Sequence, residues 1–186
     1  MNTELENSLK TLKNKDVLLY PTDTVWGIGC DATSEDAVNK IFKLKQRSES
    51  KSLIILVNNF EMLCKYIPEI SEEVKNLLRN SIKPTTIIYN NPIGLAKNVV
   101  ADDNTVAIRI PKNDFCFQLI KDFGKPIVST SANISGAATP NCFEEIDAAI
   151  LDSVDYVVNL QRKEVNHKSS TILKVGENGE IIVLRD

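Results

Sequence analysis

Two patterns of apolar and polar residues alternate along this chain, and each predicts a different kind of element. Apolar residues three or four positions apart share one face of a helix, whereas short apolar runs are typical of buried strands. Leu5, Leu9 and Leu12 follow the helical pattern, and Ser34 stands where it can cap a second helix. Helices are expected at residues 4–13, from Ser34 toward Arg47, and at 60–66, 71–79, 114–123 and 143–151, and strands at 17–20, 53–57, 86–89, 105–110, 127–129, 156–158, 171–175 and 181–184.

The order of these elements predicts an α/β fold. Strands interleaved with helices favour an open, twisted, mixed sheet with flanking helices. Glu177-Asn178-Gly179-Glu180 lies between the last two strands, and an Asn-Gly pair is a strong signal for a hairpin turn. With 186 residues, 42% of them hydrophobic, the chain is expected to form one domain over residues 1–186, without an additional C-terminal domain.

Composition and charge exclude several classes of protein. The sequence has no apolar run long enough for a membrane span and no secretory leader, so we expect a cytoplasmic protein. Four scattered cysteines and one histidine provide no ligand set for a structural metal, and the thiols are expected to be reduced and mostly buried. A net charge of -3 argues against a surface that grips nucleic acid broadly, so any basic patch is local.

The first candidate for chemistry is the segment of residues 20–30, where an apolar strand gives way to hydroxyls, a carboxylate and two glycines. We interpret this segment as the rim of a ligand site, in which Gly27 and Gly29 allow the backbone to approach a ligand closely. The alternative is an ordinary strand end with Trp26 in the core.

Two further segments carry concentrated polar chemistry. Residues 45–51 place Lys45, Arg47 and Lys51 at a predicted helix end, where cations either complement the helix C-terminus or converge on a polyphosphate. Residues 126–136 end an apolar strand in four hydroxyls and an amide. Such side chains are common in turns, but this density equally suits a site for phosphate or ribose oxygens.

Together these three segments resemble the signatures of the YrdC/TsaC family: a Pro-Thr-(Glu/Asp)-Thr-x-(aromatic)-Gly-x-Gly loop, a Lys-x-Arg motif, and a Ser-Ala-Asn motif, in the same order and at matching spacing. Residues 105–111 look like the Val-Arg-x-Pro strand of that family, and residues 169–172 look like its late Ser-Thr-Ile strand. The resemblance extends over nearly the whole chain, from about Val17 to Arg185. It implies a YrdC-like sheet around a concave basic cavity.

The resemblance also implies an activity, which is L-threonylcarbamoyladenylate synthesis from L-threonine, bicarbonate and ATP, with pyrophosphate as the second product. The adenylate would then pass to partner proteins that form threonylcarbamoyladenosine in tRNA. The matching motifs contain no histidine and no obvious carboxylate pair that could act as an acid and base couple. The rate enhancement would therefore come from alignment of the reactants and from cations on the phosphates. Mg²⁺ would be carried with the ATP, without a metal site in the protein.

The family pattern assigns a role to each matching residue. Thr22, Arg109 and Ser170 would contact threonine, with Arg109 on its carboxylate. Lys45 and Arg47 would be the catalytic cations on the triphosphate. The nucleotide would be held by Lys51, Thr105, Ser129, Ser131, Asn133, Thr139 and Arg185.

The chain departs from the family pattern in three places. Asp23 stands where many members have Glu, and residues 81–86 keep only the later proline and threonine of a Trp-Pro-Gly-Pro-x-Thr segment. Leu56 occupies the position nearest to a histidine that longer members carry. The shorter side chain of Asp23 changes how the loop is held in place. The changes in residues 81–86 weaken any role assigned to the missing tryptophan, and no amino-acid contact is transferred to Leu56.

Three other functions stay open from the sequence. One is a module that binds double-stranded RNA or the ribosome, and weak RNA binding is compatible with a local basic patch. A second is a carbamoyl-adenylating domain with a different acceptor, and a more distant third is a Ser131/His167 hydrolase, which lacks a Gly-x-Ser-x-Gly elbow. Pyrophosphate release separates an enzyme from a binding module, and dependence on threonine identifies the acceptor.

Overall fold

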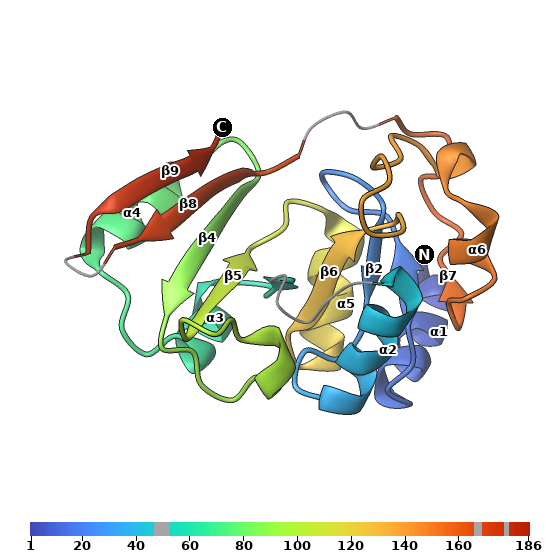
Figure 1. The fold of residues 1–186 in the computed structure, drawn as a ribbon, viewed down its shortest axis with the longest axis horizontal. Coiled ribbons are helices and arrows are strands. Elements are labelled where there is room, and N and C mark those ends of the chain that lie inside the picture. Colours follow the sequence, from blue (N-terminus) through green and yellow to red (C-terminus); the bar gives the residue numbers. More distant parts are fainter. Residues whose placement is uncertain (47–52, 166–168, 177–178) are drawn as a thin grey trace.

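The computed structural model describes residues 1–46, 53–165, 169–176 and 179–186 of the chain. Figure 1 shows a single twisted, open sheet whose strands run in the order β7-β1-β2-β6-β3-β5-β4-β8-β9. The strands are β1 (Leu18–Tyr20), β2 (Gly27–Gly29), β3 (Ile54–Leu56), β4 (Thr85–Asn90), β5 (Thr105–Arg109), β6 (Ile127–Ser131), β7 (Tyr156–Val157), β8 (Thr171–Val175) and β9 (Ile181–Arg185). The helices are α1 (Asn2–Lys13), α2 (Glu35–Lys45), α3 (Phe60–Tyr66), α4 (Glu72–Asn80), α5 (Asp114–Phe123) and α6 (Ala148–Leu151), with 3-10 turns η1 (Lys97–Val99) and η2 (Phe143–Glu145).

The sheet is mixed, as predicted from the interleaved elements. The pairs β1/β7, β3/β5 and β4/β8 are parallel, and the remaining neighbours are antiparallel. Strands β8 and β9 form the expected C-terminal antiparallel pair, although Glu177 and Asn178 of the predicted turn lie outside the described residues.

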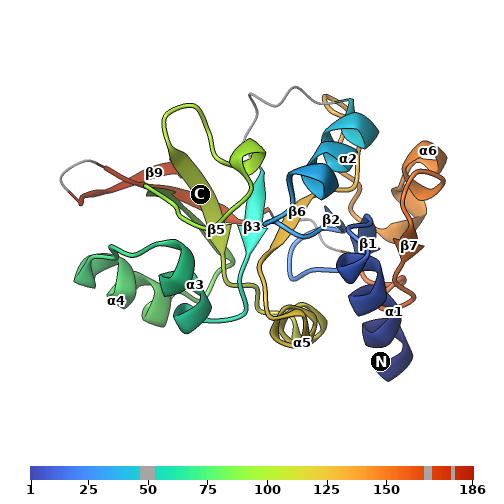
Figure 2. The ribbon, with the colours of Figure 1, turned by 90° about the horizontal axis from the view of Figure 1, so that it is seen from below.

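Helices α3, α4 and α5 cover one face of the sheet, whereas α2 lies on the opposite side (Figures 1 and 2). Strand residues alternate between these two faces. Ile55, Ile108 and Val128 are buried in the core. Their neighbours Ile54, Ala107 and Ser129, which lie side by side in the strand register, point to the other face, where no helix covers the middle of the described sheet. The fold therefore leaves one sheet face available for a ligand.

Several helices begin at the side chains that local chemistry favours. Ser34 caps α2 by accepting a hydrogen bond from the Ala37 amide, and Asn113 caps α5 through the Cys116 amide. Helix α2 ends at Gln46 in the left-handed region, with φ 50°. No helix of the described residues is long and apolar enough to cross a membrane.

The structure corrects three predictions. The helix expected at 143–151 is broken into η2 and α6, because Ile146 adopts an extended conformation and Asp147 caps the second piece through the Ala149 amide. Strand β2 was expected to be loop. Of the four thiols, Cys30 and Cys116 are buried, but Cys64 is exposed and Cys142 is only partly covered.

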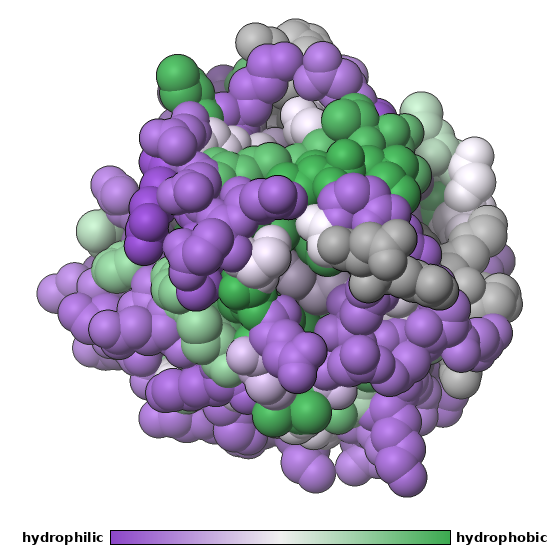
Figure 3. Space-filling view, turned by 90° about the vertical axis from the view of Figure 1, so that its left-hand side faces the viewer, coloured by the Kyte–Doolittle hydropathy of each residue, from purple (hydrophilic) through white to green (hydrophobic). Residues whose placement is uncertain are grey.

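The last strand forms an apolar edge. Figure 3 views the β8 and β9 end of the molecule and shows apolar surface among polar surface. The large exposed apolar side chains of this end are Ile82, Ile182, Val183 and Leu184.

Candidate active site

A cavity of about 610 Å³ lies on the sheet face opposite α3, α4 and α5, a size within the range of sites for small molecules. Loop, strand and C-terminal residues contribute to it together. Its lining is formed by Thr24, Val25, Trp26, Gly27, Ile54, Thr86, Ile88, Ala107, Arg109, Ser129, Thr130, Ser131, Thr139, Asn141, Ser169, Ser170, Ile172 and Arg185. The charged members of this lining are two arginines, and eight of the other sixteen members carry a hydroxyl group, so the polar part of the described walls suits an anionic ligand rich in oxygen atoms.

Arg109 stands at the end of β5 with its guanidinium buried. Its Nη1 atom lies 3.1 Å from Asp23 Oδ1 and donates a hydrogen bond of 3.1 Å to Thr24 Oγ1. Its Nε atom is buried without a hydrogen-bond partner in the described part of the chain. Arg109 lines the cavity, so its guanidinium is suited to a ligand carboxylate.

Thr22 supports this arrangement from beneath the cavity. Its hydroxyl donates to the Val25 carbonyl at 2.7 Å and accepts from the Thr24 amide at 3.0 Å. The hydroxyls of Thr22 and Thr24 are 3.0 Å apart, so a directed chain of hydrogen bonds runs from Arg109 through both threonines. Thr22 does not line the cavity, whereas Thr24 does.

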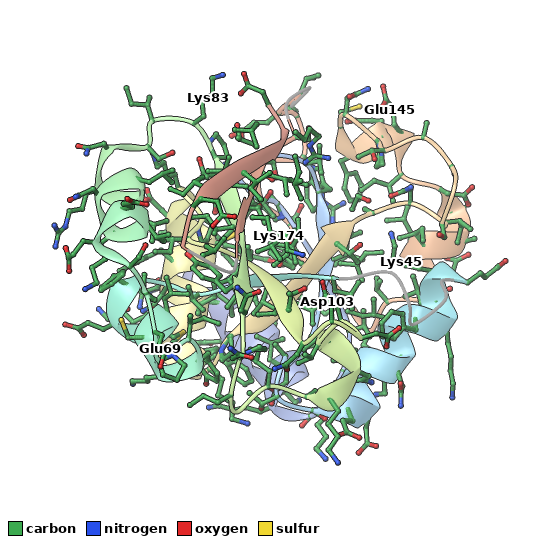
Figure 4. The ribbon with its side chains drawn as sticks, turned by 60° about the vertical axis from the view of Figure 1, so that its left-hand side comes forward. Lys45, Glu69, Lys83, Asp103, Glu145 and Lys174 are labelled. Atoms are coloured by element: carbon green, nitrogen blue, oxygen red, sulfur yellow. The ribbon has the colours of Figure 1, made fainter. Side chains whose placement is uncertain are left out.

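The polar turn after β6 is held by Lys45 (Figure 4). The Lys45 side chain is 1% exposed, and its Nζ atom donates to the carbonyls of Ser131 and Asn133. Ser131 Oγ donates to Asn133 Oδ1 at 2.5 Å, and Asn133 Nδ2 donates to the Ala137 carbonyl at 2.7 Å. Ser131 faces the cavity, whereas Lys45 and Asn133 shape the turn from outside the lining.

The opposite wall comes from the C-terminal strands. The hydroxyls of Ser170 and Thr86 are 2.8 Å apart in a buried position, and Arg185 donates to the Ser170 carbonyl through Nε and Nη2. Arg185 thereby ties β9 to the start of β8 at the cavity wall. Ser129 and Thr139 complete the set of expected residues that line the cavity.

Thr105 is placed differently from the expectation. It begins β5, at the far end of the strand from Arg109, and its hydroxyl donates to Asp103 Oδ1 at 2.6 Å. Figure 4 shows Asp103 close to Lys174, with which it forms an ion pair of 3.2 Å. Thr105 therefore interacts with Asp103 and, through it, with Lys174, and it does not line the cavity.

Three expected residues, Arg47, Lys51 and His167, lie outside the described residues. Sequence reasoning assigned no role to Thr24, Thr86 and Asn141, which line the cavity. For Thr86 the signal is the sheet register, since Thr86 pairs directly with Arg109 across β4 and β5.

The two glycines of the first loop have different roles. Gly27 lines the cavity, as expected for close approach of a ligand. A Cβ atom on Gly29 would lie 2.4 Å from the Val128 carbonyl oxygen and 2.7 Å from the Tyr20 ring. Gly29 is therefore required by packing within the chain, which corrects the expectation that it admits a ligand.

Burial favours the neutral form of two acidic groups near the loop, Tyr20 and Cys116. Burial raises the pKa of Tyr20 well above its usual value, and its hydroxyl donates to the Val128 carbonyl. Burial also raises the pKa of the Cys116 thiol, and the charge of Asp23 raises it further. No group of three potential metal ligands is present among the described residues.

Comparisons of sequence place this chain beside known proteins. Residues 10–186 match the Sua5/YciO/YrdC family model, which is described as telomere recombination. The chain is 33% identical over 157 residues to the threonylcarbamoyl-AMP synthase of Enterobacter sp. (strain 638), with 83% of each chain covered. It is 32% identical over 179 residues to the threonylcarbamoyl-AMP synthase of Pseudoalteromonas translucida, with 94% of each chain covered.

Solved structures of related proteins match the fold of this chain. The crystal structure of P. abyssi Sua5 complexed with L-threonine matches with a TM-score of 0.87 and 25% identity, covering 100% of this chain and 54% of that chain. The chain thus spans about half the length of P. abyssi Sua5. The crystal structure of E. coli YciO matches with a TM-score of 0.87, covering 100% of this chain and 90% of that chain, and at 20% identity this likeness shows the fold alone.

Proposed function

This chain belongs to the Sua5/YciO/YrdC family, and from that membership and the geometry of its cavity we propose that it is a threonylcarbamoyl-AMP synthase. The observation that carries the proposal is the buried Arg109 guanidinium, whose Nε atom has no protein partner in the described residues and whose side chain lines the cavity. A free amino acid presents a carboxylate that this group would bind. The threonine complex of P. abyssi Sua5 shows that a protein of this fold accepts L-threonine.

The two ends of the cavity would divide the substrates between them. Arg109, Thr24 and the Ser170 and Thr86 hydroxyls would hold threonine by its carboxylate and hydroxyl. Ser129, Ser131, Thr139 and Arg185 would border the nucleotide, with Lys45 fixing the turn that carries Ser131. We retain Arg47 and Lys51 as the phosphate contacts, on the family motif alone, because they lie outside the described residues.

The reaction would proceed by substrate alignment. The amine of threonine forms a carbon–nitrogen bond with bicarbonate, water leaves, and one oxygen of the resulting carbamate attacks the α-phosphorus of ATP. The bond from that phosphorus to the bridging oxygen breaks, and pyrophosphate departs. Walls of hydroxyls and arginines hold the reactants in line and offset the developing phosphate charge, and these effects can supply several kcal/mol.

Mg²⁺ would enter with the ATP phosphates, because it favours oxygen ligands and the described cavity lining contains no carboxylate. We propose that the adenylate passes to partner proteins of tRNA threonylcarbamoyladenosine formation, that the reaction occurs in the cytoplasm, and that RNA binding is weak. The net charge of -3 supports the last point.

An omission experiment tests the proposal. The protein is incubated with ATP, Mg²⁺, bicarbonate and threonine, each is omitted in turn, and pyrophosphate and the nucleotide product are measured. We expect an AMP adduct and pyrophosphate only in the complete mixture. ADP with phosphate would contradict the assignment, pyrophosphate without threonine would indicate another acceptor, and no turnover would favour an RNA-binding module.

A further inference from the structure

Asp23 and Arg109 form a buried ion pair at the cavity. The two side chains are 8% and 4% exposed, respectively. Asp23 lies in the loop before β2, and Arg109 ends β5, which β6 and β3 separate from β2 in the sheet. The pair therefore joins two parts of the sheet at the point where the threonine carboxylate would bind.

Asp23 is held by two partners. Its Oδ1 atom forms an ion pair with Arg109 Nη1 at 3.1 Å, without hydrogen-bond geometry, and its Oδ2 atom accepts a hydrogen bond from the Lys112 backbone amide at 3.0 Å. Lys112 follows β5 closely, so the carboxylate fixes the loop to the same strand end that carries Arg109. Both partners are donors, and an ionised carboxylate is an acceptor at each oxygen.

This arrangement fixes how the Arg109 guanidinium is oriented at the cavity wall. Nη1 is engaged by Asp23 and Thr24, whereas Nε has no hydrogen-bond partner within the described residues. A guanidinium is a planar fork that binds a carboxylate through two parallel N–H groups, so its orientation decides whether that contact forms. Rotation about the side-chain torsions of Arg109 would change the orientation of the guanidinium at the cavity wall.

We propose that Asp23 is a positioning residue that fixes the orientation of the Arg109 guanidinium for the carboxylate of the amino-acid substrate, an inference that rests on the proposed function. Threonine binding would then depend on Asp23 although Asp23 does not line the cavity. ATP binding at the other end of the cavity would not depend on Asp23.

The Asp23→Asn substitution distinguishes positioning from simple charge. An asparagine of the same shape must turn its NH₂ group toward either Arg109 or Lys112, and both are donors, so the two-sided contact is lost. Loss of the negative charge alone would have the opposite effect, because an uncompensated Arg109 attracts a carboxylate more strongly. The two accounts therefore predict changes of opposite sign in the KM for threonine.

Asp31 provides a matched control on the other side of β2. Its side chain is 6% exposed, pairs with Lys125 at 2.9 Å, and accepts from the Thr33 amide at 2.8 Å. It is thus as buried as Asp23 and also has two partners, Lys125 and Thr33, but neither of them lines the cavity. Asp31→Asn measures the general cost of removing such a carboxylate.

The experiment measures threonine-dependent pyrophosphate release by wild type, Asp23→Asn, Asp23→Glu and Asp31→Asn, with thermal unfolding of each. We expect Asp23→Asn to raise the KM for threonine by about tenfold or more while the KM for ATP stays near wild type. Asp31→Asn should change neither KM selectively. Asp23→Glu keeps two acceptor oxygens and should retain most of the threonine affinity.

An unchanged or lowered threonine KM in Asp23→Asn would overturn the proposal, and so would an equal rise for both substrates. If Asp23→Asn does not fold, the Asp23→Glu variant tests the proposal instead. A large and selective rise of its KM for threonine would contradict the proposal, because this variant keeps both carboxylate oxygens. A wild-type protein without threonine-dependent turnover would instead contradict the proposed function.

Discussion

Lys45 offers a direct test of how the polar turn is held. Its ammonium group is buried and donates to the carbonyls of Ser131 and Asn133, and its own carbonyl accepts from the Ser135 amide at 3.0 Å. Hydrogen bonds to a charged group contribute about 1.5 to 3 kcal/mol each. Lys45→Met keeps much of the apolar stem but removes both bonds and leaves two carbonyls without this donor. We therefore expect a loss of about 3 to 5 kcal/mol in the free energy of unfolding.

Urea denaturation followed by circular dichroism measures this loss, with Lys43→Met as the control. Lys43 lies on the same helix but is exposed, so its substitution should change stability by no more than about 0.5 kcal/mol. A loss of several kcal/mol is a large part of the roughly 5 to 15 kcal/mol that stabilise a domain. Equal urea midpoints of unfolding for Lys45→Met and wild type would refute the assignment of Lys45 as the residue that holds the turn.

Three further predictions follow from the same geometry. Gly29→Ala should lower the free energy of unfolding by about 1 to 3 kcal/mol in urea denaturation, because its Cβ would lie 2.4 Å from the Val128 oxygen; wild-type stability would show that β2 shifts freely. Because the pKa of Tyr20 is raised in the folded protein, its contribution to the free energy of unfolding is complete below pH ~10 and is lost as the pH rises further. Tyr20→Phe should therefore reduce the slope of the alkaline loss of stability by about 1.4 kcal/mol per pH unit. An unchanged slope would contradict this. Arg109→Ala should weaken threonine binding by about 2 to 5 kcal/mol while ATP binding is retained, and equal loss of both in steady-state kinetics would make Arg109 structural.

Local signals in the sequence were sufficient for most elements. Helix α5 has the predicted bounds, because its apolar spacing and its Asn113 and Gly124 caps agree. Strand β2 was missed because its three residues carry only one large apolar side chain. It exists through pairing with β1 and β6 on both sides, and Gly29 allows the Val128 carbonyl to approach. Such long-range contacts leave no periodic pattern in the chain.

The site was predictable in its residues more than in its contacts. Arg109, Ser131 and Arg185, to which the family pattern assigns substrate contacts, line the cavity, because strand ends that carry polar side chains meet on one face. The motifs do not specify which atom each residue contacts, so the burial of Thr22 beneath Thr24 required the structure. The same holds for the pairing of Asp23 with Arg109.

The fate of bicarbonate carbon tests the central claim most directly. The protein is incubated with ATP, Mg²⁺, L-threonine and ¹³C-labelled bicarbonate, and the nucleotide product is analysed by mass spectrometry against an unlabelled reaction. A threonylcarbamoyl-AMP synthase yields an adenylate that contains threonine and carries the isotopic shift of one carbon. A threonine adenylate without the label, or a labelled threonine carbamate that is not adenylated, would contradict the account.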